Sequence, residues 1–388
     1  MRGMVAIAIG CAVVSFLCFL TPVLVMNPFT TQRKGLLMMA LRLHKAGPIV
    51  SAVCAIAAAA VLLLSWAGSG SHRAQEISFA IALMGAALTR LNVFELVFRP
   101  YGAPDFVAAG AIALEHDAMV MSFTAGGETH AYPVGAMGYH HIVNDTVGGA
   151  PIAATYCTVC HTGIVWNRVL DGRSLTFRLA GIHDGNALLR DEQTKSVWQQ
   201  STGEAIFGPL RGKRLEPMYS DEVSYGLWRR ENPEGSILKP VARFTSLYRN
   251  QGWEKFVEWF PAVMDTSETG VDARELVVGI ATASASKAFR AQAVLSAGLV
   301  QDRVGDEPVV LLVGPDNLSV RAFRVPANTT LLRIGQTITD AETSSVWNFS
   351  GCATQGARAG ECLEALSVVR QYWFDWQLYH PATDVYRS

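Results

Sequence analysis

The chain has 388 residues and a formal net charge of −1 at pH 7. This length leaves room for a membrane region plus one large or two smaller domains, because single hydrophobic cores stop growing at about 250–300 residues. The balanced charge, with no Lys/Arg cluster in the soluble part, gives no attraction for phosphate backbones, so we expect no nucleic-acid partner. Half of the residues are hydrophobic, and this excess lies in the first hundred residues, which indicates a membrane protein.

The first apolar segment, Met4 to Met26, contains no charged residue and is long enough to cross a bilayer. We predict a transmembrane helix here rather than a cleaved signal peptide, since no small-residue cleavage site follows before Pro28. A second uncharged segment, Pro48 to Ala67, predicts another span. The lipid bilayer is therefore the first expected partner.

A third candidate span, Ile77 to Phe98, contains Arg90 and Glu95. Because an unpaired ion in mid-bilayer is costly, these residues lie near an interface or the segment lies partly on the membrane surface. Residues 1–99 are thus predicted to be a membrane region with two or three helices. The loop after the first span is basic and belongs in the cytoplasm by the positive-inside rule; three spans would then leave the soluble domain inside, and two would leave it outside.

From Phe106 onward, short apolar runs alternate with turns rich in Gly, Pro, Asn and Asp, as in AMVMSFTAGGETHAYPV and PVVLLVGPDNLSVRAFRV. This pattern is typical of antiparallel strands joined by tight turns. We therefore predict a mainly β domain with few helices after the transmembrane helices.

The soluble part also contains an internal repeat. The stretch that begins at His130 matches the stretch that begins at Lys287, with V-x-D-x-V-G-x-x-P in both, and two later blocks align Trp198 with Trp347 and Trp228 with Trp376. Three blocks in the same order predict a two-lobed domain built by duplication. We place the first lobe at 106–240, a helical linker at 241–286 and a second, degenerate lobe at 287–388.

The seven cysteines fall into three groups. Cys11, Cys18 and Cys54 lie in apolar spans and are expected to be inert. Cys352 and Cys362 occupy the positions at which the first lobe has Glu204 and Arg214, on either side of a Gly-Pro-rich turn, which predicts a cross-strand disulfide. Disulfides persist in oxidising compartments, so this pair favours an extracytoplasmic domain.

The third group, Cys157 and Cys160, forms a C-x-x-C motif that only the first lobe carries. Three chemistries use this spacing. The pair is a thiol-disulfide centre if Cys157 attacks and Cys160 resolves, with His140 or His161 as the base or charge that favours thiolate. It is half of a copper or zinc site if His140 joins the two thiolates. With His161 it matches the C-x-x-C-H signal for haem c, although the β-rich context argues against haem. A fourth interpretation is a permanent structural disulfide.

The blocks HHIVNDTVGG, PIAATYCTVCHTG and DEQTKSVWQQSTGEAIFGPLRGK resemble the bacterial domain-of-unknown-function 3179 family over about Phe106 to Ser388. Members are often secreted or membrane-anchored, and some are described as selenoproteins, which implies a redox-active thiol position. The family usually has a small or polar residue where this chain has His161, so the match to the haem signal is incidental. The positions that match the family motif are His140, Asn144, Asp145, Thr155, Tyr156, Cys157, Cys160 and Trp198.

Taken together, these patterns lead to the hypothesis of a protein anchored in the bacterial inner membrane, with an extracytoplasmic thiol-disulfide oxidoreductase domain that uses Cys157 and Cys160. A redox partner protein is expected with this activity. The metal-binding module and the structural envelope protein remain as alternatives, and the substrate is left open.

Overall fold

The computed structural model describes residues 2–27, 34–68, 71–249, 257 and 269–387. The chain divides into two compact units. The first consists of Met1–Arg99 together with Leu179–Leu188, and the second of Pro100–Arg178 and Leu189–Ser388.

The first unit is helical, as the sequence predicts. Its helices are α1 (Arg2–Val25), α2 (Lys34–Trp66), α3 (Arg73–Leu88) and α4 (Val93–Val97). Two of them, Arg2–Val25 and Gly35–Trp66 within α2, are long and apolar enough to cross a membrane. Helix α2 begins 14 residues before the predicted start at Pro48, because the preceding run of Leu, Met, Ala and Arg consists of strong helix formers. Helix α3 has 16 residues, fewer than the about 20 that a span needs.

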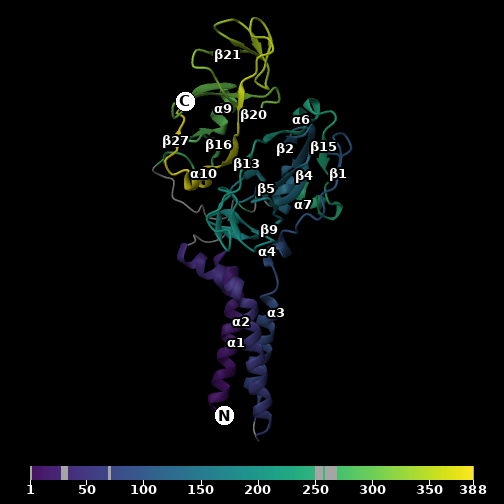
Figure 1. Cartoon of the computed structure of the whole chain (residues 1–388), viewed down its shortest axis with the longest axis vertical. Coiled ribbons are helices and arrows are strands. Elements are labelled where there is room, and N and C mark those ends of the chain that lie inside the picture. The colour runs from purple at the N-terminus through teal and green to yellow at the C-terminus, as the bar shows by residue number, and fades with distance from the viewer. Residues whose placement is uncertain (1, 28–33, 69–70, 250–256, 258–268, 388) are drawn as a thin grey trace. The chain divides into compact units, whose positions relative to one another are not determined.

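Small side chains bring the three longer helices together, and Figure 1 shows α1, α2 and α3 side by side. Ser15 on α1 donates a hydrogen bond to the Ala82 carbonyl on α3 at 2.7 Å. A Cβ atom on Gly85 would lie 2.6 Å from the Ser15 hydroxyl, so only glycine allows this approach. Large apolar side chains such as Ile49 and Ile56 point outward, 72% and 71% exposed. Small residues between helices and large apolar residues outside are typical of membrane helices.

The hairpin segment 179–188 belongs to this same unit. Asn92, the N-cap of α4, donates from its side chain to the Leu179 carbonyl at 2.7 Å, and the Ile182 amide donates to the Met26 carbonyl at 3.0 Å. The second bond satisfies a backbone carbonyl at the end of α1 that would otherwise lack a partner.

The second unit is mostly β, and its first lobe includes two sheets to which two short helices are attached. One sheet has the order β1-β15-β3-β2-β14 and the other β13-β6-β5-β4. Their bounds are β1 Phe106–Ala108, β2 Met119–Ala125, β3 Glu128–Pro133, α5 Val134–His140, β4 Ile142–Val147, β5 Ala150–Cys157, β6 Thr162–Asn167, β13 Pro217–Met218, β14 Asp221–Ser224, α6 Tyr225–Glu231 and β15 Ser236–Leu238.

A third sheet of this half of the chain has the order β12-β11-β10-β9, and a two-stranded ribbon pairs β7 with β8. The bounds are β7 Val169–Leu170, β8 Arg173–Ser174, β9 Phe177–His183, β10 Asn186–Asp191, β11 Val197–Gln199 and β12 Ala205–Phe207.

The second lobe, together with β16 from the end of the predicted linker, forms three four-stranded sheets within the described residues, with the orders β26-β16-β17-β27, β18-β19-β20-β25 and β21-β22-β23-β24. The bounds are β16 Leu276–Ala281, β17 Ser286–Arg290, α9 Ala291–Ala297, β18 Leu299–Val304, β19 Glu307–Val313, β20 Val320–Arg324, β21 Leu331–Ile334, β22 Thr337–Asp340, β23 Val346–Trp347, β24 Ala353–Gln355, β25 Glu364–Leu366, β26 Val369–Tyr372, α10 Trp373–Tyr379 and β27 Asp384–Val385.

The two lobes share one order of elements. Strand β15 pairs in parallel with β3, Ser236 facing His130, and β27 pairs in parallel with β17, Asp384 facing Lys287. Helix α9 begins 157 positions after α5, and α10 begins 148 positions after α6, in agreement with the repeat seen in the sequence. The common ancestry of the lobes itself stays a prediction.

Each lobe has its own hydrophobic core. The first is centred on Tyr132, Met137 and Tyr156, and the second on Phe289, Val309 and Leu311. Of the predicted linker, the structure describes a 3₁₀ turn at Ala242–Phe244, a short helix α7 at Thr245–Arg249 and, near its end, strand β16, which pairs with β17. Residues 250–256 and 258–268 of that linker lie outside the described residues.

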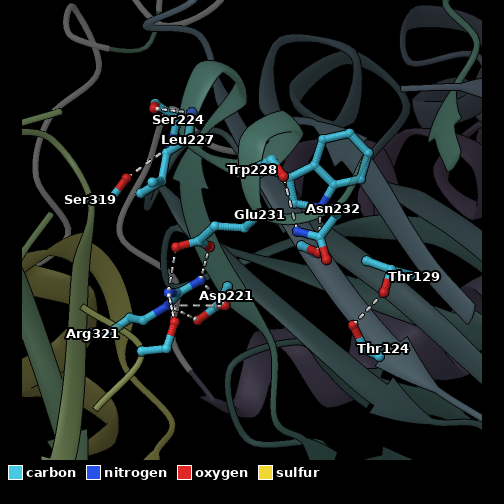
Figure 2. A network of polar contacts seen from close by, with 12 residues as sticks. Thr124, Thr129, Asp221, Ser224, Leu227, Trp228, Glu231, Asn232, Ser319 and Arg321 are labelled. Carbon is cyan, nitrogen blue, oxygen red and sulfur yellow. Dashed lines mark hydrogen bonds and ion pairs between the residues drawn. The ribbon is translucent and has the colours of Figure 1, made fainter. Parts of the chain in front are cut away.

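An ion-pair cluster joins the two lobes, and Figure 2 shows it around Arg321. This guanidinium on β20 donates to the Asp221 carboxylate at 2.8 Å and to the Glu231 carboxylate at 2.7 Å. The Ser224 amide also donates to the Ser319 hydroxyl at 2.9 Å. Because the Arg321 side chain is only 9% exposed, this cluster pairs charges away from water.

Candidate functional site

The C-x-x-C motif forms the tip of a β-hairpin in the first lobe. Strands β5 and β6 pair antiparallel with Cys157 opposite Thr162, so that residues 158–161 make the turn. The Thr158 hydroxyl donates to the Gly138 carbonyl at 2.7 Å, which anchors the turn to the end of α5. His161, the last turn residue, has a positive φ of 59°. Cys157, at the end of β5, and Cys160, in the turn, are both inside the fold.

The two cysteines are adjacent thiols, and both are 0% exposed. The Cys160 thiol donates to the Cys157 carbonyl oxygen at 3.8 Å. Burial raises the pKa of Cys160 well above its ordinary value, and the Cys157 thiol and the nearby Asp375 carboxylate raise it further. Cys160 is therefore a protonated thiol at neutral pH.

Residues of the second lobe complete the surroundings of the motif. The Tyr372 amide donates to the Cys160 carbonyl at 2.9 Å. The Thr162 hydroxyl lies 2.9 Å from the Gln371 side-chain oxygen and 3.0 Å from an Asp375 carboxylate oxygen. Both Gln371, on β26, and Asp375, on α10, are buried. The site is thus built from both lobes, although only one carries the cysteines.

The first lobe adds further polar contacts through the segment that follows β11. The Ser201 hydroxyl donates to the same Asp375 oxygen at 3.0 Å. The Gln200 side chain donates to the Thr155 hydroxyl at 3.2 Å and to the Thr162 carbonyl at 3.1 Å. A carboxylate held by two hydroxyl groups has a fixed orientation beside the thiols.

His140, which the sequence proposes as a base, a charge or a metal ligand, lies among aromatic rings. It is the last residue of α5 and is 2% exposed. Its Nε2 atom lies 2.5 Å from the Tyr248 hydroxyl, and its ring centroid lies 4.9 Å from that of Tyr101 and 5.7 Å from that of Phe244. These contacts tie α5 to the segment that follows the first lobe.

His161 lies between two tyrosine rings, 5.7 Å from Tyr156 and 5.6 Å from Tyr372 between centroids. Burial, together with the positive charge of Arg370, lowers the pKa of His161 to about 4. The neighbouring His141, whose carbonyl accepts from the Tyr156 amide at 2.8 Å, also has its pKa lowered by burial to about 4. Neutral imidazoles supply no positive charge to the thiols.

The other motif residues singled out from the sequence join strands. Asp145 is 2.7 Å from both the His130 ring nitrogen and the Tyr132 hydroxyl. The Asn144 side chain bonds both the amide and the carbonyl of Phe177. Within the described residues, no group of three or more His, Cys, Asp or Glu side chains is arranged to hold a metal ion. This geometry therefore adds nothing to the metal-binding alternative, which stays a prediction.

Cys352 and Cys362 form a disulfide in the second lobe, at a bridge that corresponds to the Glu204 and Arg214 bridge of the first. Sequence reasoning did not find Asp375, Gln371 or Ser201. A comparison of the two repeats could have pointed to Asp375. It precedes Trp376, which aligns with Trp228, so the first lobe has Leu227 where the second has this acid.

The family model described as "Protein of unknown function (DUF3179)" matches residues 102–383. The chain therefore belongs to this family, as the sequence motifs predict. No curated protein and no solved structure matches it.

Proposed function

We propose that this member of the family is a membrane-anchored thiol-disulfide redox protein in which Cys157 and Cys160 are the redox pair. The observation that carries the proposal is the adjacency of two buried thiols at one hairpin tip. In the oxidising direction, the two thiols and an external disulfide R–S–S–R give one Cys157–Cys160 disulfide and two R–SH. Two electrons and two protons pass to the external disulfide, so no further reactant is needed.

Cys157 takes the attacking role and Cys160 the resolving role. Thiolate, not thiol, is the nucleophile, and the raised pKa of Cys160 keeps that residue protonated until the second step. Because both sulfurs are 0% exposed, a disulfide reagent reaches them only when the residues around the hairpin tip move. We expect exchange to be slower than at an exposed C-x-x-C.

The proposed location of the domain is outside the cytoplasm, on a bacterial inner membrane. Its support is the Cys352–Cys362 disulfide, since such bonds persist in oxidising compartments. Helices α1 and α2 supply the proposed anchor in the bilayer. A redox partner protein that exchanges electrons with the pair is part of the same proposal.

The test is a redox titration of the full chain in detergent, with Cys11, Cys18 and Cys54 replaced by alanine so that only the pair can titrate. After equilibration at a series of glutathione ratios, alkylation and mass spectrometry count the remaining thiols. We expect Cys157 and Cys160 to lose their alkylation sites together in one reversible transition, and Cys157→Ser to abolish it. A pair that stays fully reduced, or fully oxidised, at every ratio until the protein is unfolded would rule out the redox function; the second result would support a permanent structural disulfide.

A further inference from the structure

A groove with apolar walls runs between α1 and α3 of the helical unit and has a volume of about 450 Å³. Two of its lining residues, Ala12 and Ser78, lie between the helices and are 5% and 4% exposed. Two others, Val13 and Ile77, are 50% and 61% exposed and form its rim. The volume is within the range of about 300–1,000 Å³ that is typical of sites for small ligands.

The groove extends along the helices for about the depth of one leaflet. On α1 it runs from Ile9 to Leu17, about 12 Å at 1.5 Å per residue, and half of a hydrocarbon core is about 15 Å thick. The two helices run parallel, because residues 18–26 line a second cavity together with residues 88–94. Figure 1 shows that α1 and α3 begin at the same end. On α3 the groove reaches Ala74, so it ends near the start of both helices.

Positive charge gathers at this end of the groove. Arg73, the first residue of α3, lies four positions before Ile77, and Arg2, at the start of α1, lies seven positions before Ile9. Both spacings place side chains on one face of a helix, which here is the groove face. Both arginines are exposed, and within the part of the chain that the structure describes neither pairs with a carboxylate. His72, the N-cap of α3, makes no side-chain capping bond, so the positive helix end is also open to an anion.

Two other polar side chains near this end fit the same kind of ligand. The Ser78 hydroxyl lines the groove and has no hydrogen-bond partner among the described residues. It lies about 7.5 Å further along the helix than Arg73, on the side where ester carbonyls follow the phosphate of a phospholipid. Glu76, the acid of the first turn, lies about 200° around the helix from Ala74, so its charge points away from the groove.

We propose that the groove between α1 and α3 binds one acyl chain of an anionic phospholipid, whose phosphate contacts Arg2, Arg73 and the first turn of α3. The inference goes beyond the redox function and rests only on the proposed membrane anchor. An acyl chain matches apolar walls, and a phosphate matches the positive charge at their end. A zwitterionic lipid has a cation beside its phosphate, which the two arginines repel, so the site prefers a headgroup with a net negative charge.

Native mass spectrometry of the full chain in detergent measures this preference. The two probes, palmitoyl-oleoyl phosphatidylglycerol and palmitoyl-oleoyl phosphatidylcholine, have the same acyl chains and differ in headgroup charge. We expect the anionic lipid to be retained at about 30-fold lower concentration, because each arginine contributes about fivefold. Arg2→Gln combined with Arg73→Gln should abolish the preference. Arg42→Gln combined with Arg90→Gln removes two exposed arginines outside the groove and, as the matched control, should keep it.

A second variant tests the groove apart from its charge. Because Ala74 is an exposed lining residue, Ala74→Phe fills the groove and leaves the contact between the helices in place. It should weaken binding of both lipids by about tenfold, the loss expected when two methylene groups are no longer buried.

Three results would overturn the proposal. They are equal retention of the two lipids by the parent chain, an unchanged preference in the variant without Arg2 and Arg73, and a two-chain species that Ala74→Phe removes, since a second copy would then occupy the groove. Flotation with phosphatidylglycerol vesicles tests the anchor separately. A chain that does not float fails as an anchored protein and this inference fails with it, whereas a chain that floats without lipid preference loses only this inference. The thiol titration depends on neither result.

Discussion

The two lobes of the second unit share a framework of contacts but differ in a few residues. In each, a buried aspartate accepts a hydrogen bond from a tryptophan seven positions later at 2.9 Å, Asp191 from Trp198 and Asp340 from Trp347. Asp145 pairs with His130 at 2.7 Å in the first lobe, and Asp302 pairs with Lys287 at 2.6 Å in the second. These shared contacts hold strands and turns together, and they recur whether or not cysteines are present.

What differs between the lobes is concentrated at two places. A salt bridge between Glu204 and Arg214 in the first lobe has its counterpart in a disulfide in the second. The hairpin tip that carries Cys157 in the first lobe has Gly314 in the second, and the second lobe contributes Asp375 to the tip instead. The comparison teaches that a contact found in both lobes belongs to the framework, whereas one found in a single lobe is a candidate for chemistry.

The largest expected effect comes from breaking the contact between the lobes. Arg321→Met leaves the Asp221 and Glu231 carboxylates without their cation in a site where the arginine is 9% exposed. Removal of one partner from such a buried cluster costs about 3–5 kcal/mol, and because both carboxylates are partly exposed we expect the lower end. Unfolding of the full chain in detergent measures the loss as a fall in melting temperature.

Arg324 supplies the matched control, because it also pairs with two carboxylates, those of Glu307 and Glu364, but is 42% exposed. Exposed pairs contribute about 0–1 kcal/mol, so Arg324→Met should have little effect. Equal losses in the two variants would show that the lobe contact is not the buried ionic junction described here.

The next effect concerns the bridge that differs between the lobes. The disulfide closes a loop with a sequence separation of 10, and loop-closure entropy assigns about 3 kcal/mol to a bond of this span. Replacing Cys352 and Cys362 by serine should therefore destabilise the second lobe by about that amount, measured by denaturant unfolding. Replacing Glu204 and Arg214 together by glutamine should lower the free energy of unfolding by only about 0–1 kcal/mol, because Arg214 is 66% exposed. A larger loss at the ion pair than at the disulfide would reverse our ranking of the two bridges.

The sequence predicts the framework well and the site only partly. Alternating apolar runs and turn residues predict the β lobes, and uncharged runs predict α1 and α2, because these signals are local. The predicted second span begins at Pro48 because the uncharged run stops short of the basic residues before it, whereas α2 begins at Lys34 and continues through Pro48. The pairing of Cys352 with Cys362 follows from the alignment of the two repeats, since a hairpin places aligned positions opposite each other.

Asp375 could not be found from local pattern. It is 215 residues from Cys160 along the chain, and its proximity depends on how α10 packs against the first lobe. His161 shows the reverse problem, because the sequence places it next to Cys160, yet burial and Arg370 leave it uncharged. Sequence distance therefore predicts neither the partner nor the charge state of a side chain at a contact between lobes.

The smallest expected effect is a difference between the lobes in how their stability depends on pH. The folded-state pKa of His161 is lowered to about 4, whereas an unfolded histidine has a pKa of about 6.5. The unfolded chain therefore binds this proton more readily, so stability is complete above pH 6.5 and falls as the pH drops toward 4, by about 1–2 kcal/mol at pH 5. His161→Gln should reduce this slope in unfolding measurements between pH 4.5 and 7.5 and leave the part due to His141, whereas the exposed His116→Gln should not change it. The second lobe responds at lower pH, because hydrogen bonds from Trp347 and Thr343 outweigh burial and lower the pKa of Asp340 to about 2, so its contribution is lost only below pH 3.8. A first lobe whose signal is unchanged from pH 7 to 4.5 would show that His161 is not the neutral, buried group that the hairpin tip requires.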